Sequence, residues 1–341
     1  MGGDLVLITG GTGFIGSRTL VKALETGYHV RAAIRSEHAA ETLRALPSVK
    51  PYLDHLEFTI VPDILKEDAY DKALEGVKYI LHLASPLAKD HFTDFEKDIL
   101  EPAIKGTTVI LSAAKRAPSV KRVVITSSVV AIASFKKFAL VETEEVFNDK
   151  SRTELPSAPP TSGMEAYCAS KTGALNATDE FLATANPSFD VVNIMPAFVF
   201  GPNQLVHEAS GLRTGTNRIV LDLLLGNKSP LPNPNSSVHV DDVAMLHVRA
   251  LDPKIAGNQS FVASSGGVKG THFEDAIDIL KREFPDAVAK GIFSLDGKQG
   301  SKICKFDSGR TEEVFGFKFL PYEAQVKDLA KNYIELVNQQ G

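Results

Sequence analysis

The stretch that decides the fold is LVLITGGTGFIG, residues 5–16, in which a short apolar run leads directly into closely spaced glycines. The run Leu5–Thr9 predicts a buried strand, and the amphipathic pattern over residues 15–24 predicts a helix behind it. Gly10 permits the tight turn between them. Gly13 lets backbone approach a pyrophosphate, and Gly16 lets helix and strand pack closely.

This turn predicts a dinucleotide site, because the N-terminus of the following helix presents free N–H groups and a positive dipole end to phosphates. Its position between a predicted strand and a predicted helix is the context that gives the glycine pattern its meaning. The residues expected to contact the cofactor here are Gly10, Thr12, Gly13, Phe14, Ile15 and Gly16.

Further apolar runs continue the pattern along the first half of the chain. They are apolar throughout, which is typical of strands covered on both faces, and helical patterns separate them. Alternating strands and helices form βαβ units with right-handed crossovers, so we predict an α/β fold with a Rossmann-type doubly wound parallel sheet up to about residue 200. The expected strands are 30–34, 58–61, 79–83, 123–126 and 191–195, with one helix at 99–114.

Two domains are expected, because the alternation of apolar runs and helical patterns gives way after Pro202 to polar and proline-rich segments. Residues 1–200 are predicted to form the dinucleotide-binding domain. Residues 201–341 are predicted to form mainly a smaller α/β substrate-binding lobe, with some chain returning to the first domain. In this part helices are expected near 219–225, 243–251, 273–284 and 324–336. An aspartate of the pair Asp241-Asp242 is expected to cap the second of them.

Composition excludes several classes of protein. The 341 residues are 43% hydrophobic and 23% charged, with a net charge of −5, which argues against a nucleic-acid partner. We expect no membrane span and no secretory leader, because no apolar run reaches the ~18 residues of a span and the first residues lack a signal pattern. With two cysteines and no histidine ligand spacing, we expect no metal and a cytoplasmic location.

The end of the second predicted strand selects the nicotinamide cofactor. An acid at this place would bind the ribose hydroxyls of NAD, whereas the strand over residues 29–34 runs into Arg35. A guanidinium there pairs with the 2′-phosphate of NADP. Glu37 is the competing ribose-binding acid. We favour Arg35 and therefore NADP(H).

A tyrosine and a lysine four residues apart, Tyr167 and Lys171, predict the chemical centre, because positions i and i+4 share one face of a helix. Reduction of a carbonyl leaves an alkoxide that must be protonated. The pKa of a free tyrosine is near 10, and a neighbouring lysine cation favours the phenolate and narrows the gap to neutral pH. Lys171 can also hold the ribose of the nicotinamide.

A strand ending in hydroxyls supports this prediction, since sites in such sheets lie beyond the carboxyl ends of the strands. The run over residues 123–126 ends in Thr126-Ser127-Ser128. Ser128 can donate a hydrogen bond to the substrate oxygen and stabilise developing charge. Ser127 is the alternative hydroxyl, and we prefer Ser128.

These motifs occur in the order and spacing of the extended short-chain dehydrogenases, which the sequence resembles over essentially its whole length. The resemblance is greatest to the branch of dihydroflavonol reductases, cinnamoyl-CoA reductases and fungal aldehyde, ketone or methylglyoxal reductases. The motifs that carry it are the glycine turn and residues 81–86, 126–128, 167–171 and 196–202.

The resemblance implies roles for individual residues. Ser128, Tyr167 and Lys171 match the family's catalytic triad, and Arg35 matches its 2′-phosphate ligand. The loop that contains Pro196 and Val199 would set which face of the nicotinamide is presented, and the family pattern implies transfer of the pro-S hydride. The remaining cofactor-binding positions implied are Asp63 and Ile64 on the adenine side, Ala84, Ser85 and Pro86 beside the cofactor, Thr126, and Pro196 and Val199 at the nicotinamide.

Two departures from the family pattern concern basic and polar residues. Many relatives have an asparagine on the central helix that organises a relay water, and Lys105 stands at that place here. Some relatives have a second basic residue shortly after the phosphate-binding arginine, where this chain has Glu37-His38-Ala39-Ala40.

The sequence therefore predicts an NADPH-dependent carbonyl reductase that acts on aldehydes or ketones as a monomer or homodimer. One alternative is an NAD-dependent nucleotide-sugar epimerase or dehydratase, which needs basic residues such as Arg213, Arg218 or Arg249 for a diphosphate. Another is an NADP-sensing protein without turnover, against which the presence of both Tyr167 and Lys171 argues.

Overall fold

The computed structural model describes residues 3–85 and 94–340, and the chain divides into two compact units. The first unit comprises Met1–Phe135, Asp149–Met195 and Ala244–Phe261. The second comprises Lys136–Asn148, Pro196–Val243 and Val262–Gly341. No helix in the described part of the chain is long and apolar enough to cross a membrane.

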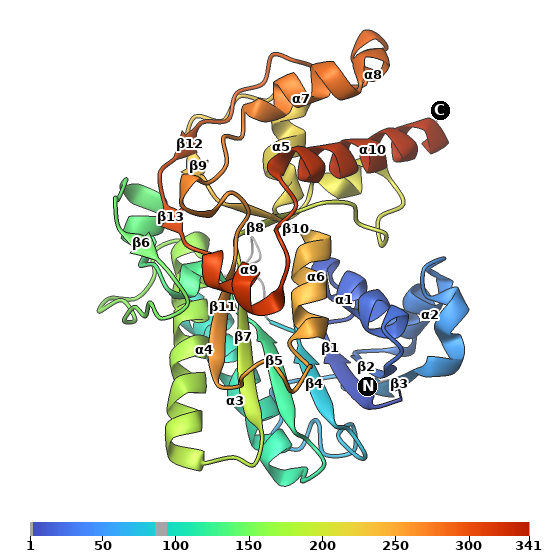
Figure 1. Cartoon of the computed structure of the whole chain (residues 1–341), viewed down its shortest axis with the longest axis vertical. Helices are drawn as coiled ribbons and strands as arrows, with labels where there is room; N and C mark the ends of the chain where they lie inside the picture. Colours follow the sequence, from blue (N-terminus) through green and yellow to red (C-terminus); the bar gives the residue numbers. More distant parts are fainter. Residues whose placement is uncertain (1–2, 86–93, 341) are drawn as a thin grey trace. The chain divides into compact units, whose positions relative to one another are not determined.

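A seven-stranded sheet forms the centre of the first unit, and every strand pairing recorded from β3 to β7 is parallel (Figure 1). Strands β2 and β3 extend the sheet on one side of β1, and β4, β5 and β7 extend it on the other, so the order reverses between β1 and β4. In spatial order the strands are β11 (Gln259–Ala263), β7 (Asp190–Pro196), β5 (Arg122–Thr126), β4 (Tyr79–His82), β1 (Leu5–Thr9), β2 (His29–Ile34) and β3 (Leu56–Ile60).

Helices follow the strands, as the alternating pattern predicts. The longest two helices of the first unit, α3 and α4, lie side by side (Figure 1). A π-helix (Glu96–Leu100) precedes α3, and the short helices η1 (Lys50–His55) and η3 (Val129–Ala131) lie in loops. The α-helices of this unit are α1 (Phe14–Glu25), α2 (Glu37–Ala45), α3 (Glu101–Arg116) and α4 (Gly163–Ala185), joined by the last residues of α6 (Val240–Arg249).

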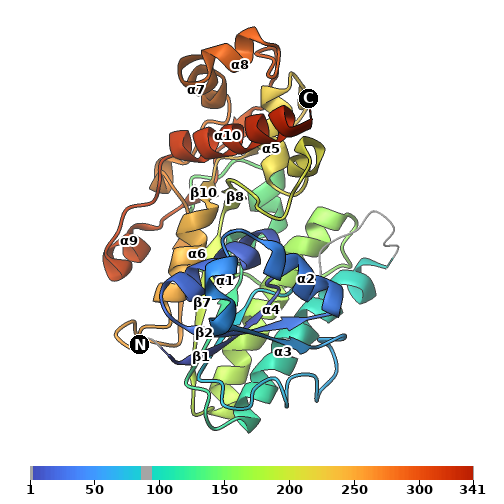
Figure 2. The same cartoon turned by 90° about the vertical axis from the view of Figure 1, so that its right-hand side faces the viewer.

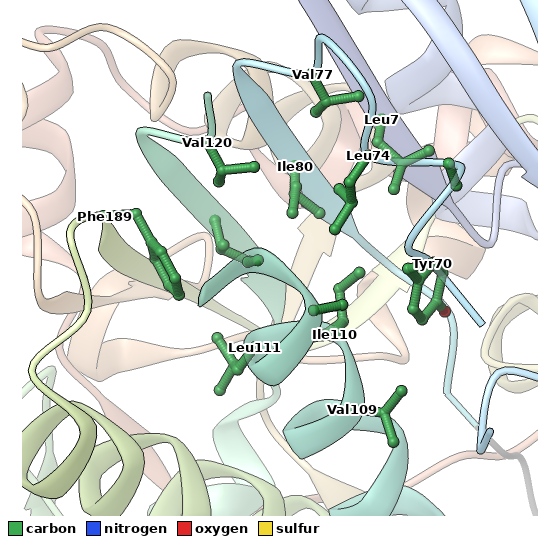
Figure 3. Packing of buried hydrophobic residues seen from close by; sticks show 14 of the residues in the cluster. Leu7, Tyr70, Leu74, Val77, Ile80, Val109, Ile110, Leu111, Val120 and Phe189 are labelled. Atoms are coloured by element: carbon green, nitrogen blue, oxygen red, sulfur yellow. The ribbon is translucent and has the colours of Figure 1, made fainter. Parts of the chain in front are cut away.

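One part of the core of the first unit lies between the sheet and α3. Ile80 of β4 and Val123 of β5 are fully buried against Ile110 and Leu111 of α3, and Figure 3 shows these strands and α3 with Leu74 and Tyr70 closing one side. Side chains alternate across a strand, so Ile125 faces the same helix and Thr126 faces away from it. This alternation decides where the polar residues at the end of β5 point.

A buried arginine brings the segment Ala244–Phe261 into the first unit. The Arg122 guanidinium is 4% exposed and binds both carboxylate oxygens of Asp190 at 2.5 and 2.8 Å. It also donates to the carbonyl oxygens of Ala250, Asp252 and Ile255. One charged group thereby ties β5 and β7 to the segment that leads into β11.

The second unit is built around α10, which runs along α5 and α7 (Figure 2). Its core includes Phe200, Phe273 and Leu329, all fully buried. The strands here are short pairs and the helices are mostly brief. The elements are η4 (Lys136–Leu140), β6 (Val146–Phe147), β8 (Phe198–Phe200), η5 (Ala209–Arg213), α5 (Asn217–Leu224), β9 (Asn233–Pro234), β10 (Ser237–His239), η6 (Gly267–Lys269), α7 (Asp275–Glu283), α8 (Pro285–Ala289), β12 (Ser301–Lys302), β13 (Lys305–Phe306), α9 (Gly309–Phe315) and α10 (Tyr322–Gln340).

The capping prediction for α6 is wrong. His239 caps this helix, because its Nδ1 accepts the backbone N–H of Asp241 at 3.0 Å. Asp242 instead accepts the backbone N–H of Leu320 at 2.8 Å and is buried. A histidine side chain can replace the usual short cap because its ring nitrogen is an acceptor when neutral.

Candidate active site

The glycine turn lies at the point where the strand order reverses, which is where open α/β sheets bind ligands. Gly10 has φ +74°, and a Cβ placed on it would lie 2.6 Å from the backbone nitrogen of Ala84. A Cβ on Gly16 would lie 1.9 Å from the carbonyl oxygen of Gly10. The end of β1, the start of α1 and the loop after β4 are therefore in contact through backbone, without room for side chains.

This arrangement fits the pyrophosphate of a dinucleotide. Helix α1 begins after Gly13, and no side chain caps its N-terminus. The N–H groups of the first turn have no partner within the helix, so they remain for an anion. Thr12 and Gly13 are exposed, and Phe14 and Ile15 are half-buried, so this surface is accessible.

A hydrogen-bonded pair fixes the two strand ends that form the crevice. Thr9 Oγ1 lies 2.9 Å from His82 Nδ1 and accepts the backbone N–H of Ala84 at 3.2 Å. Burial, assisted by the positive charge of Lys171, lowers the pKa of His82 to about 3. The imidazole is therefore neutral and serves here as a hydrogen-bonding group.

Beyond β2, Arg35 is exposed and makes no hydrogen bond or ion pair with the described residues. Ser36 occupies the N-cap position of α2, and its hydroxyl makes no capping bond. The competing acid, Glu37, is bound by Arg44 at 2.7 Å. A free guanidinium, a free hydroxyl and a helix N-terminus together suit a phosphate. Ser36 is a candidate ligand that the sequence reasoning missed.

The other residues of the first unit that were expected to bind the cofactor differ in their exposure. Asp63 is exposed after β3 and accepts the N–H of Leu65 at 2.9 Å, while Ile64 packs against the core. Ala84 and Ser85 are half-buried after β4. Pro86 lies outside the described residues.

Helix α4 carries Tyr167 and Lys171 on one face, as the i, i+4 spacing predicts. The ammonium of Lys171 lies 6.0 Å from the centre of the Tyr167 ring and donates to the carbonyl oxygen of Thr126 at 3.3 Å. A side-chain hydrogen bond joins Tyr167 and Ser128. The helix thereby meets the end of β5 at the three residues proposed as a triad.

The two ionisable groups have pKa values moved by burial. Burial raises the pKa of Tyr167, and the hydrogen bond with Ser128 acts in the opposite direction. Burial lowers the pKa of Lys171 to about 8. The phenol is therefore protonated at neutral pH, as a proton donor must be, while the lysine titrates close to neutrality.

The serines after β5 have different surroundings. Ser128 Oγ accepts the backbone N–H of Val130 at 3.4 Å, so it also caps a short helix while it contacts Tyr167. Ser127 Oγ is buried and has no hydrogen-bond partner in the described part of the molecule. Thr126, which precedes Ser127, points to the other face of the sheet. There its Oγ1 lies 2.7 Å from Nε2 of the fully buried His247.

Two of the expected cofactor residues belong to the second unit. Pro196 and Val199 are buried, and the Val199 carbonyl accepts the hydroxyl of Thr216 at 2.5 Å. Their part in binding stays a prediction.

Sequence reasoning missed the buried polar residues behind the site, namely His82, Asn193 and His247. A signal was present for Asn193, because it interrupts an otherwise apolar buried run from Val191 to Met195. Lys105, which the sequence places where relatives have asparagine, is exposed on α3. Thr107, two residues further, is the buried polar residue there.

The fold and the site define a short-chain dehydrogenase-type protein. Within that class, the chain belongs to the NAD dependent epimerase/dehydratase family, which it matches over residues 6–263. It is 42% identical over 344 residues to Ketoreductase CTB6 of Cercospora nicotianae, covering 98% of this chain and 96% of that protein.

Solved structures show the same similarity. Yeast methylglyoxal/isovaleraldehyde reductase Gre2 complexed with NADPH superposes with a TM-score of 0.80 at 27% identity, covering 98% of this chain and 99% of the other. Gre2 from Candida albicans in complex with NADPH gives a TM-score of 0.83 at 27% identity, with the same coverage.

Proposed function

We propose that the protein is an NADPH-dependent reductase of aldehydes or ketones, with Tyr167 as the proton donor. The observation that carries this proposal is the hydrogen bond between Tyr167 and Ser128, one helical turn from Lys171. The similarity to a ketoreductase and to Gre2 reductases supports the same class of reaction.

In the proposed reaction the substrate oxygen accepts hydrogen bonds from Ser128 and Tyr167. Reduced nicotinamide, when bound, supplies the hydride to the carbonyl carbon. Charge then develops on the oxygen, and Ser128 stabilises it while Tyr167 transfers its proton to form the alcohol. Lys171 stabilises the phenolate that remains, because a cation 6.0 Å from the ring favours the charged form.

Two features support NADPH as the cofactor. The unpaired Arg35 beside Ser36 offers charge-assisted hydrogen bonds to a 2′-phosphate. Glu37 is the acid that would favour NAD, and its carboxylate is already bound to Arg44.

Epimerase activity, the alternative function, has less support. It requires free basic residues for a substrate diphosphate, yet Arg213 and Arg218 both pair with Asp222, at 2.7 and 3.0 Å. Their charge is thus partly neutralised within the second unit.

The proposal is tested by incubating the purified protein with NADPH and a panel of aldehydes and ketones, and separately with UDP-hexoses. We expect NADPH oxidation matched by an equal amount of alcohol, and no change in the sugars. Conversion of a UDP-hexose without net oxidation of the cofactor would show instead that the protein is an epimerase.

A further inference from the structure

A small cavity lies inside the first unit, on the face of the sheet that packs against α3 and α4. Its volume is about 20 Å³, and its polar lining includes His82, Thr107, Ser127, Lys171, Thr178 and Asn193. Strand register explains part of this grouping. His82 on β4 pairs with Ile125 on β5, which pairs with Asn193 on β7, so the three side chains form one row across the sheet.

Two polar atoms of this lining lack a partner among the described residues: Ser127 Oγ and Asn193 Oδ1. Asn193 is 3% exposed and Ser127 is 8% exposed, so bulk water does not reach them freely. Leaving a buried polar atom without a hydrogen bond costs about 1–3 kcal/mol, which makes two in one cavity unusual in a native fold. Asn193 Oδ1 can only accept, so its missing partner is a donor, whereas the Ser127 hydroxyl can either accept or donate.

The size and polarity of the cavity suit a water molecule. A water needs roughly 10–15 Å³ of such space and two to four polar partners, and this cavity offers both. The ammonium of Lys171 has three N–H groups, of which one is directed to the Thr126 carbonyl. A water molecule here can donate to Ser127 Oγ and Asn193 Oδ1 and accept from Lys171.

We propose that this cavity is a binding site for one ordered water, held by Ser127 and Asn193, and that Asn193 positions the Lys171 ammonium through it. The effect on turnover rests on the proposed function, whereas the water site itself does not. Asn193 lies on β7 and does not contact the reacting atoms, so it is a positioning residue. Its contribution is to give the buried ammonium a second hydrogen-bond acceptor.

The first test is a high-resolution crystal structure of the cofactor-free protein. We expect density for one water within hydrogen-bond distance of Ser127 Oγ and Asn193 Oδ1. A dry cavity, or side chains turned so that protein groups bond both atoms, would overturn the proposal.

The second test measures the pKa of Lys171 by NMR in cofactor-free protein labelled with ¹³C-lysine, with Lys171→Met used to assign the signal. Asn193→Leu fills the cavity with an apolar group. We expect it to lower the pKa of Lys171 by roughly 0.4–1 unit, because it removes one hydrogen bond of the charged form. The matched control Asn176→Leu lies on α4 outside the cavity, where Asn176 bonds the Thr153 carbonyl.

Equal pKa values in wild type, Asn193→Leu and Asn176→Leu would contradict the positioning role. If Asn193→Leu does not fold, Asn193→Ser retains an acceptor and is expected to keep the pKa close to wild type. A protein that reduces no carbonyl yet contains the water and shows the pKa shift would defeat the proposed function and leave this inference intact.

Discussion

Among single residues, Arg35 is expected to distinguish the two nicotinamide cofactors. Its guanidinium is exposed and free of partners among the described residues, so replacing it removes no contact within the fold. We expect Arg35→Ala to raise the KM for NADPH by roughly 10- to 100-fold, from the loss of charge-assisted hydrogen bonds worth about 1.5–3 kcal/mol. The KM for NADH should change little.

The control for this prediction is Arg116→Ala, which removes another exposed arginine of the first unit, paired with Asp71. It should leave both KM values unchanged. If Arg35→Ala weakened NADH and NADPH equally, recognition of the 2′-phosphate by Arg35 would be disproved.

Lys171 is expected to make activity depend on pH, because burial lowers its pKa to about 8. Its ammonium is charged below this pH and loses its charge as the pH rises through it. We therefore expect kcat/KM for carbonyl reduction to fall above about pH 8, since this parameter reports the free enzyme. Lys105→Gln changes an exposed lysine of α3 and should leave the profile unaltered. A wild-type profile that stays flat up to about pH 10 is the contradicting result.

Much of the residue-level site could be predicted from the sequence, because its chemistry follows short-range spacing. Tyr167 and Lys171 share a face through the geometry of one helix, and Ser128 follows a recognisable strand. His82 and His247 could not be assigned in the same way. Their partners, Thr9 and Thr126, lie 73 and 121 residues away in the sequence.

At the scale of elements, the contact between β1 and α1 depends on glycine. A Cβ on Gly16 would meet the Gly10 carbonyl oxygen at 1.9 Å, so α1 would have to shift away from the turn. We expect Gly16→Ala to abolish NADPH binding, measured by calorimetry, and to lower the melting temperature. Gly106 offers a matched control inside α3, where a Cβ would have ordinary contacts at 3.7 Å.

Gly106→Ala is expected to stabilise the protein by about 0.5–1 kcal/mol, because alanine has the higher helix propensity. Cofactor binding should be retained. Equal effects of the two substitutions on NADPH binding would show that close approach at Gly16 is not required.

Helix α6 gives a second prediction, through Asp242. Burial, opposed by the Leu320 N–H and assisted by the charges of Asp241 and Glu312, raises the pKa of Asp242 to about 6. The folded protein thus retains this proton at a pH where the unfolded chain has released it. The contribution of Asp242 to stability therefore falls as the pH rises from about 4 to about 6 and stays low above that.

Asp242→Asn removes this ionisation and keeps an oxygen for the Leu320 N–H. We expect it to raise the free energy of unfolding at pH 7 by something on the order of 1–3 kcal/mol and to have little effect near pH 4. Asp241→Asn, at the more accessible neighbouring position, is the control. Denaturant unfolding at both pH values measures the effect, and a gain at pH 4 as large as that at pH 7 would contradict the assignment.

Six strands of the sheet and the helices α1, α3 and α10 were predicted within about four residues, because continuous apolar runs and 3.6-residue periodicity are local properties. For α4 only the turn that carries Tyr167 and Lys171 was predicted. Strand β11 was missed. It is a five-residue segment that joins the sheet far along the chain from its neighbour β7, and the buried Arg122 clamp near it depends on backbone carbonyls that no sequence pattern displays.

At the scale of the whole molecule, the parallel sheet with its order reversal at β1 and β4 confirms the predicted Rossmann-type fold. The similarity to reductases extends over 98% of the chain, beyond the sheet and into the second unit. Pairings in the second unit are only two or three residues long, which gives too little periodicity for sequence analysis to find them. Its role in binding the carbonyl substrate remains a prediction.

Proton donation by Tyr167 is tested by comparing steady-state NADPH oxidation by wild type, Tyr167→Phe and the control Tyr52→Phe, with NADPH binding measured in parallel. General acid catalysis contributes about 10²–10⁴-fold, so we expect Tyr167→Phe to lose at least about 100-fold in kcat while it still binds NADPH. Tyr52→Phe should match wild type. Wild-type turnover by Tyr167→Phe would show that Tyr167 is not the proton donor, since the proton would then come from another group.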